Sequence, residues 1–93
     1  MVPKKSAVWM SNLPDRFTLA LGQRVFEARN KREVTLRELA RKMSANGHKY
    51  TYGGLSQVER GEINCTVRVL CQIAKALDVK PSVLLDPRWR QKI

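Results

Sequence analysis

The sequence has too few of the residues from which metal and redox sites are usually built. It contains one histidine, His48, and two cysteines, Cys65 and Cys71, whose spacing suits neither a zinc pair nor a CxxC redox site. We therefore expect no metal site and no cofactor, and we interpret both cysteines as small core residues. A Ser/His/Asp set and a phosphate-binding loop are also missing, which argues against an enzyme.

Long apolar runs are absent as well. No stretch approaches the ~20 apolar residues that span a bilayer. The N-terminus, MVPKKSAVWMSNLP, begins like the n-region of a signal peptide but lacks an apolar h-region. We therefore expect a cytoplasmic protein without a membrane-spanning segment.

Acidic residues are scarce relative to basic ones. Eight Asp and Glu stand against 18 Lys and Arg, so the 93 residues carry a formal net charge of +10. Such a charge favours a polyanionic partner, first nucleic acid and second an anionic membrane, with a solubilising surface as the alternative. The sequence lacks the basic amphipathic helix with aromatics that is typical of membrane-surface proteins, so we expect no membrane partner. The hydrophobic content of 43% predicts a folded chain.

Five helices and no strand are predicted, because apolar residues recur at three- and four-residue steps instead of alternating. Asp15, Thr35, Thr51 and Thr66 are the expected N-caps, and Glu38 completes a capping box with Thr35. The predicted helices are 16–31, 35–44, 51–60, 66–77 and 81–85, with a loop at 45–50. The residues predicted to be buried are Phe17, Leu21, Val25, Ala28, Leu36, Leu39, Ala40, Met43, Leu55, Val58, Val67, Leu70, Cys71, Ala74 and Leu77.

The length predicts one small domain. We expect an N-terminal arm over 1–14, a domain over 15–86 and a C-terminal tail over 87–93. Lys4 and Lys5 charge the arm and either follow DNA or stay solvated. We expect Trp9 to cover Phe26, which falls off the buried stripe of its helix; a frayed terminus is the alternative.

The stretch from Leu21 to Leu85 resembles the helix-turn-helix family of the phage lambda repressor and Cro, the XRE-type regulators. The resemblance rests on LGQRV at 21–25, Arg29, LRELA at 36–40, LSQVERG at 55–61 and IAKALDV at 73–79. It implies an all-α, five-helix DNA-binding domain whose 51–60 helix enters the major groove of double-stranded DNA. It further implies a bacterial or phage transcription regulator of the repressor or controller type.

Residue by residue, the resemblance also implies contacts. Gln57 is the favoured base reader, because its amide can bond bidentately to adenine. For the paired glycines, the alternative is a helix that starts only at Gly54 or Leu55. Arg29 should pair with Glu59, with Glu38 nearby. The implied base contacts are Tyr52, Gly53, Gly54, Ser56 and Gln57, and the implied phosphate contacts are Arg37, Arg41, Lys49, Arg60, Asn64 and Thr66.

Three features depart from the family pattern. The stretch between Ala40 and Glu59 is longer than the family's usual spacing, and the excess falls near 45–49. Leu36 replaces a common glutamine that holds a DNA phosphate, and Cys65 stands where proline is common. The conformation of the lengthened turn is therefore not predicted by the resemblance.

A single domain of this kind makes few base contacts, so we expect a homodimer on two half-sites. Tail disorder is the alternative for the last residues. We expect no small-molecule effector, because no residues remain for an effector domain. An antitoxin-like or accessory protein-interaction module with the same fold is the alternative function. The predicted dimer surface is formed by Val83, Leu84, Leu85, Trp89 and Ile93.

Overall fold

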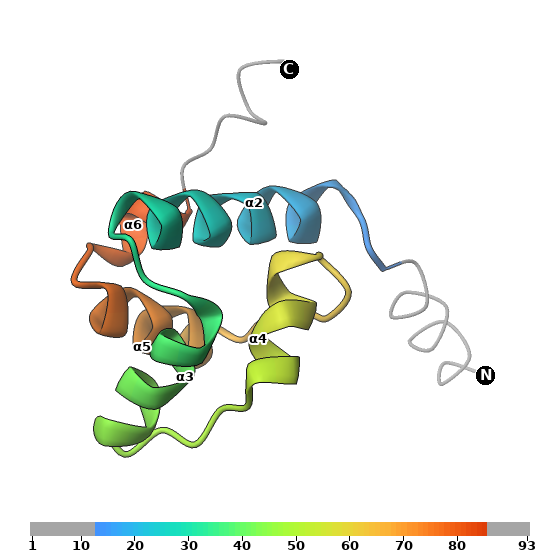
Figure 1. Cartoon of the computed structure of the whole chain (residues 1–93). Helices are drawn as coiled ribbons and strands as arrows, with labels where there is room; N and C mark the ends of the chain where they lie inside the picture. Colours follow the sequence, from blue (N-terminus) through green and yellow to red (C-terminus); the bar gives the residue numbers. More distant parts are fainter. Residues whose placement is uncertain (1–12, 86–93) are drawn as a thin grey trace.

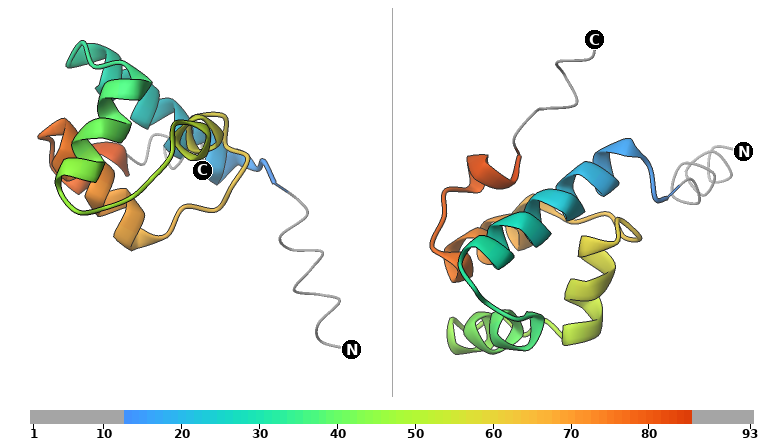
Figure 2. Two further views of the ribbon diagram at one scale, coloured as in Figure 1. Left: turned by 60° about the horizontal axis from the view of Figure 1, so that its bottom comes forward. Right: turned by 45° about the horizontal axis from the view of Figure 1, so that its top comes forward.

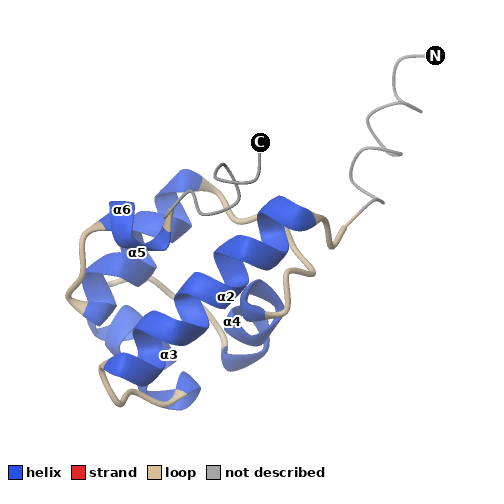
Figure 3. Ribbon diagram, turned by 90° about the horizontal axis from the view of Figure 1, so that it is seen from above, coloured by secondary structure: helices blue, strands red, loops and turns tan. Residues whose placement is uncertain are grey.

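The structure, a computed structural model, describes residues 13–85 as helices joined by loops (Figures 1 and 3). The prediction of an all-α domain is confirmed. Within 13–85, no helix is long and apolar enough to cross a membrane. The predictions for Lys4, Lys5, Trp9, Trp89 and Ile93 fall outside the described residues. The helices, labelled as in Figure 1, are α2 (Arg16–Lys31), α3 (Leu36–Ala45), α4 (Tyr52–Glu59), α5 (Val67–Leu77) and α6 (Pro81–Leu84).

The four longer helices begin at the predicted N-caps, where a side-chain oxygen satisfies backbone N–H groups that lack helical partners. The Asp15 carboxylate accepts from the backbone N–H groups of Phe17 and Thr18, both at 2.9 Å. Thr35 and Glu38 form the predicted capping box, with distances of 3.1 and 2.8 Å. The Thr35 backbone N–H in that box lowers the pKa of Glu38. The other two caps are Thr51, bonded to Gly54 N at 2.9 Å, and Thr66, bonded to Val69 N at 3.1 Å.

The end of α3 explains the lengthened turn. Gly47 has φ +86, its N–H donates to Ser44 O at 2.9 Å, and the His48 N–H donates to Met43 O at 2.8 Å. This pair of bonds is a Schellman motif, which closes a helix with a left-handed residue. The Schellman motif therefore ends α3 at Ala45. Residues 48–50 then connect it to Thr51, the N-cap of α4.

The helices surround one apolar core. α2 packs against α4 and α6, α3 packs against α4 and α5, and α5 packs against α6 (Figures 1 and 2). Each fully buried Leu, Ile or Val contributes about 1.5–3 kcal/mol of transfer free energy. The largest fully buried side chains are Leu39, Met43, Leu55, Ile73, Leu77, Leu84, Val25 and Val58.

Three positions predicted to be buried are exposed. Phe17 is 50% exposed and Val67 is 74% exposed, and Cys71 is also on the surface. Phe17 and Val67 lie in the first turns of their helices, so part of each side chain extends past the neighbouring elements. In α5 the buried stripe is centred on Leu70, Ile73 and Leu77, and Cys71 lies beside it. The prediction that Cys71 is a core residue was therefore wrong.

Candidate nucleic-acid interface

The C-terminal end of α4 lies directly on α2, and Gly22 makes this approach possible. A Cβ atom at Gly22 would lie 2.4 Å from the carbonyl oxygen of Glu59 and 2.5 Å from that of Val58. Real Cβ atoms essentially never come closer than 3.0 Å to such atoms. Only glycine therefore lets the two backbones meet, and this contact sets how far α4 stands from α2.

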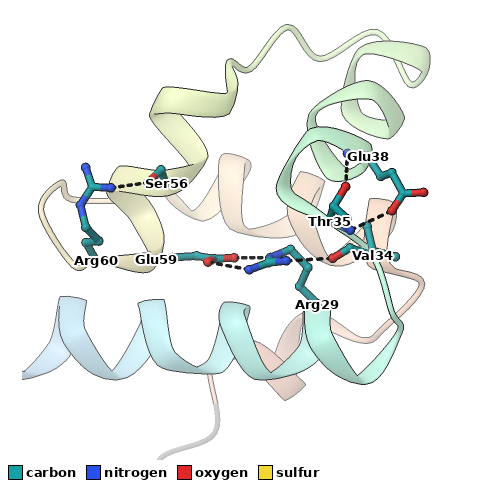
Figure 4. A network of polar contacts seen from close by, with 7 residues as sticks. All are labelled: Arg29, Val34, Thr35, Glu38, Ser56, Glu59 and Arg60. Carbon is teal, nitrogen blue, oxygen red and sulfur yellow. Dashed lines mark hydrogen bonds and ion pairs between the residues drawn. The ribbon is translucent and has the colours of Figure 1, made fainter.

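A bidentate ion pair fixes the same end of α4. The Nε–H of Arg29 donates to Glu59 Oε2 at 2.7 Å, and Nη2 donates to Oε1 at 3.1 Å (Figure 4). Nη1 of Arg29 donates to Val34 O at 2.9 Å. The two side chains are only 11% and 9% exposed. One guanidinium thus joins α2, α4 and the connector before α3 through charge-assisted hydrogen bonds.

Glu38 does not join this pair as the resemblance implied. Its carboxylate accepts from the backbone N–H of Thr35, and Figure 4 shows it on the far side of the connector from Glu59. Its role is to cap α3, because an acidic group in the first turn satisfies the N-cap N–H and complements the helix dipole.

The outer face of α4 presents the residues that the resemblance assigned to bases. Leu55 and Val58 are buried, whereas Tyr52, Gly53 and Gln57 are exposed and the other two assigned residues are half-buried. The helix begins at Tyr52, so Gly53 and Gly54 both belong to its first turn. The alternative of a helix that starts only at Gly54 or Leu55 is therefore wrong. Nothing lies within 4 Å of a Cβ placed at Gly53.

A hydrogen bond joins Ser56 and Arg60 on the exposed side of α4. Nη1 of Arg60 donates to the Ser56 hydroxyl (Figure 4), and the same guanidinium donates twice to Glu62, at 2.7 and 3.1 Å. These bonds raise the pKa of Arg60 and lower that of Glu62. A phosphate at Arg60 would therefore compete with the Glu62 carboxylate, which the sequence reasoning did not foresee.

The first turns of α3 and α4 meet at Arg37 and Tyr52. The Arg37 guanidinium lies 5.3 Å from the centroid of the Tyr52 ring, within cation–π range. These two side chains line a shallow pocket with Arg29, Thr35 and Leu36. The structure therefore places Arg37, an implied phosphate contact, beside Tyr52, an implied base contact.

The other implied phosphate contacts are more dispersed. Arg41 and Lys49 are exposed on α3 and in the turn, and Asn64 and Thr66 are exposed in the loop after α4. Asn64 lines a groove with Phe17 and Leu85, between α2 and α6. Asn64 therefore lies near Leu85, a residue of the predicted dimer surface.

Two adjoining helices, α3 and α4, with α4 held against α2 and one face of α4 exposed, define a helix-turn-helix domain. Residues 25–84 match the helix-turn-helix family HTH_3. The protein belongs to this family of Cro/C1-type DNA-binding transcription regulators. No match was found among curated proteins.

Two solved structures are similar to this one. The restriction-modification controller protein C.AhdI from Aeromonas hydrophila shares 27% identity with a TM-score of 0.64, over 72% of this chain and 94% of C.AhdI. An HTH_3 family transcriptional regulator from Vibrio cholerae shares 23% identity with a TM-score of 0.68, over 81% of this chain and 39% of that one. The second likeness shows the fold alone.

Proposed function

We propose that this protein regulates transcription by sequence-specific binding of double-stranded DNA, with α4 inserted in the major groove. The observation that carries the proposal is the exposed face of α4, with Tyr52, Gly53 and Gln57, on a helix whose C-terminal end is fixed to α2. Helix-turn-helix proteins read base edges with the N-terminal residues of their second helix. The likeness to C.AhdI, a controller protein, supports a regulator over a protein-interaction module.

Gln57 is the side chain that we expect to carry most of the base discrimination. A site selected from random DNA by the wild-type protein should lose about 1–3 kcal/mol of preference when Gln57→Ala is tested on it. Binding to random DNA should persist, because phosphate contacts carry no sequence information.

Gln23→Ala is the matched control, because Gln23 is an exposed glutamine on α2 that bonds to Glu27. It should leave the preference unchanged. If Gln57→Ala keeps the wild-type preference, another residue reads the bases. If the wild-type protein selects no sequence at all, the proposed function is wrong.

We propose phosphate contacts from Arg37, Arg41 and Lys49 in addition to those of the loop after α4. Each phosphate that a basic residue neutralises releases counterions, so the affinity falls as salt rises. Removing one such side chain should lower affinity about equally on all sequences and reduce the salt slope by about 1. A uniform loss of affinity with a smaller salt slope therefore distinguishes a phosphate contact from the base contact proposed for Gln57.

Among the described residues, the dimer surface that we propose omits Leu84 from the predicted one and adds Phe17. Leu84 is 1% exposed and belongs to the core, so it holds α6 in place and cannot contact a partner. Val83 and Leu85 are exposed, at 38% and 55%, and Phe17 lines the groove beside Leu85. A homodimer that covers this apolar edge would place two copies of α4 on two half-sites.

Leu85→Glu is expected to weaken this dimer strongly, because it places a charge in an apolar contact. Sedimentation at micromolar concentration should show the variant as a monomer, and its circular dichroism spectrum should stay that of the folded wild type. Phe26→Gln is the control: Phe26 is 43% exposed and lies about two and a half turns from Phe17, on the opposite side of α2. The control is uncharged because the Phe26 ring lies 5.5 Å from the Arg29 guanidinium. A wild-type protein that stays monomeric with and without its selected DNA would exclude the dimer.

A further inference from the structure

The last residue of the lengthened turn, Tyr50, packs under the beginning of α4. Its side chain is half-buried against the core, next to the N-cap Thr51. A Cβ placed on Gly54 would lie 3.4 Å from Tyr50 Cε2 and 3.6 Å from Tyr50 Cζ. These are ordinary van der Waals distances, so the aromatic ring lies directly beside the first turn of α4.

The same ring shares the core with Cys65, which lies in the loop before α5. Burial raises the pKa of Tyr50, and the negative charge of a Cys65 thiolate raises it further. Cys65 packs against the same core, where burial raises its pKa to about 11. Its chain neighbours are Asn64 and Thr66, two of the implied phosphate contacts. The Tyr50 ring therefore lies beside the first turn of α4 and packs on the same core as the loop that carries Asn64 and Thr66.

We propose that Tyr50 is a positioning residue that sets the first turn of α4 relative to the Asn64–Thr66 loop, and thereby sets sequence specificity. This inference rests on the proposed function. Arg29 and Gly22 fix the C-terminal end of α4, and Tyr50 supplies the contact at the end that reads bases. Hydrogen bonds to base edges weaken steeply when donor and acceptor are misplaced. Moving this turn should therefore impair base contacts more than phosphate contacts.

DNA binding tests the functional part. The ratio of affinities for the selected site and for random DNA is measured for the wild type, Tyr50→Phe, Tyr50→Leu and Tyr50→Ala. Tyr50→Phe should keep the ratio, because the ring remains. Tyr50→Ala should lower this affinity ratio about tenfold or more, while the affinity for random DNA and its salt slope stay close to wild type. Tyr50→Leu fills the core without a flat ring and should lose specificity too, which keeps the test valid if Tyr50→Ala unfolds.

Two results would overturn the inference. Tyr50→Ala and Tyr50→Leu with wild-type ratios would show that the ring does not position α4. A loss in Tyr50→Phe as large as in Tyr50→Ala would show that the hydroxyl contacts DNA directly. A wild-type protein without any sequence preference would instead refute the proposed function.

Thiol chemistry tests the contact without DNA. In a Cys71→Ser background, Cys65 is the sole cysteine, and its alkylation rate depends on its thiolate fraction and exposure. Adding Tyr50→Ala, or Tyr50→Leu, should expose Cys65 and lower its pKa. Each unit by which the pKa falls raises the thiolate fraction about tenfold and the alkylation rate about three- to fourfold, because a less basic thiolate is a weaker nucleophile. Tyr50→Phe should react nearly as slowly as the parent. Unchanged rates in both the Ala and Leu variants would show that the ring does not cover Cys65.

Discussion

Glu59→Ala is expected to lower the free energy of unfolding by about 3–5 kcal/mol, because it leaves the largely buried Arg29 guanidinium without its carboxylate. Among the described residues, the Val34 carbonyl oxygen would still accept from the guanidinium, and the uncharged Phe26 ring would still lie 5.5 Å from it. For a domain of this size, each kcal/mol corresponds to about 4–8 °C in melting temperature. Chemical denaturation monitored by circular dichroism measures the loss directly.

The exposed pair of Arg60 and Glu62 provides the control for this variant. Both side chains are more than 40% exposed, and water screens such pairs so well that Glu62→Ala should hardly change the melting temperature. Replacing both members of the buried pair, by Arg29→Met with Glu59→Leu, should restore much of the loss, because no buried charge is left unpaired. A Glu59→Ala protein as stable as wild type would mean that the pair is hydrated in solution.

Gly22→Ala is expected to destabilise the protein by about 1–3 kcal/mol even though alanine favours helices by up to ~1 kcal/mol over glycine. The added methyl group would overlap the carbonyl oxygens of Val58 and Glu59, which belong to backbone and cannot rotate away. α4 would have to move away from α2, so DNA affinity should fall as well. Thermal unfolding and binding to the selected site measure the two effects.

Gly53→Ala is the matched control, because a Cβ at Gly53 has open space around it. The same substitution there should stabilise the free protein by about 0.5–1 kcal/mol. The opposite signs at the two glycines separate helix propensity from steric overlap. If Gly22→Ala also stabilised the protein, the close approach of α2 to α4 would be refuted.

The ends of the helices were the part of the fold that sequence reasoning predicted best. Asp15, Thr35, Thr51 and Thr66 all cap as expected, because a cap depends on hydrogen bonds within four residues of chain. α2 and α5 also end where predicted, at Lys31 and Leu77, but the backbone conformation just after each was not predicted. Glu33 and Asp78 adopt left-handed φ values of 57 and 58, which few non-glycine residues adopt and which no local pattern predicts.

The contacts between helices were much harder to predict from the sequence. Three consecutive apolar residues, 83–85, do not reveal which one faces inward, and the packing of α6 on α2 and α5 decides that it is Leu84. The Gly22 contact had a signal that was not used: a glycine inside a helix is unfavourable and usually has a packing reason. The role of Tyr50 depends on the path of the lengthened turn, which only the folded chain defines.

The eight residues of α4 have a consequence for hydrogen exchange. Isolated helices shorter than ~12–15 residues are marginal in water, so α4 owes its helical form to docking against α2 and α3. The backbone amide hydrogens at its C-terminal end, such as that of the C-cap residue Arg60 bonded to Ser56 O, should then exchange only when α4 separates from the domain. Their exchange rates therefore measure the fraction of time in which the helix proposed to read DNA is not formed.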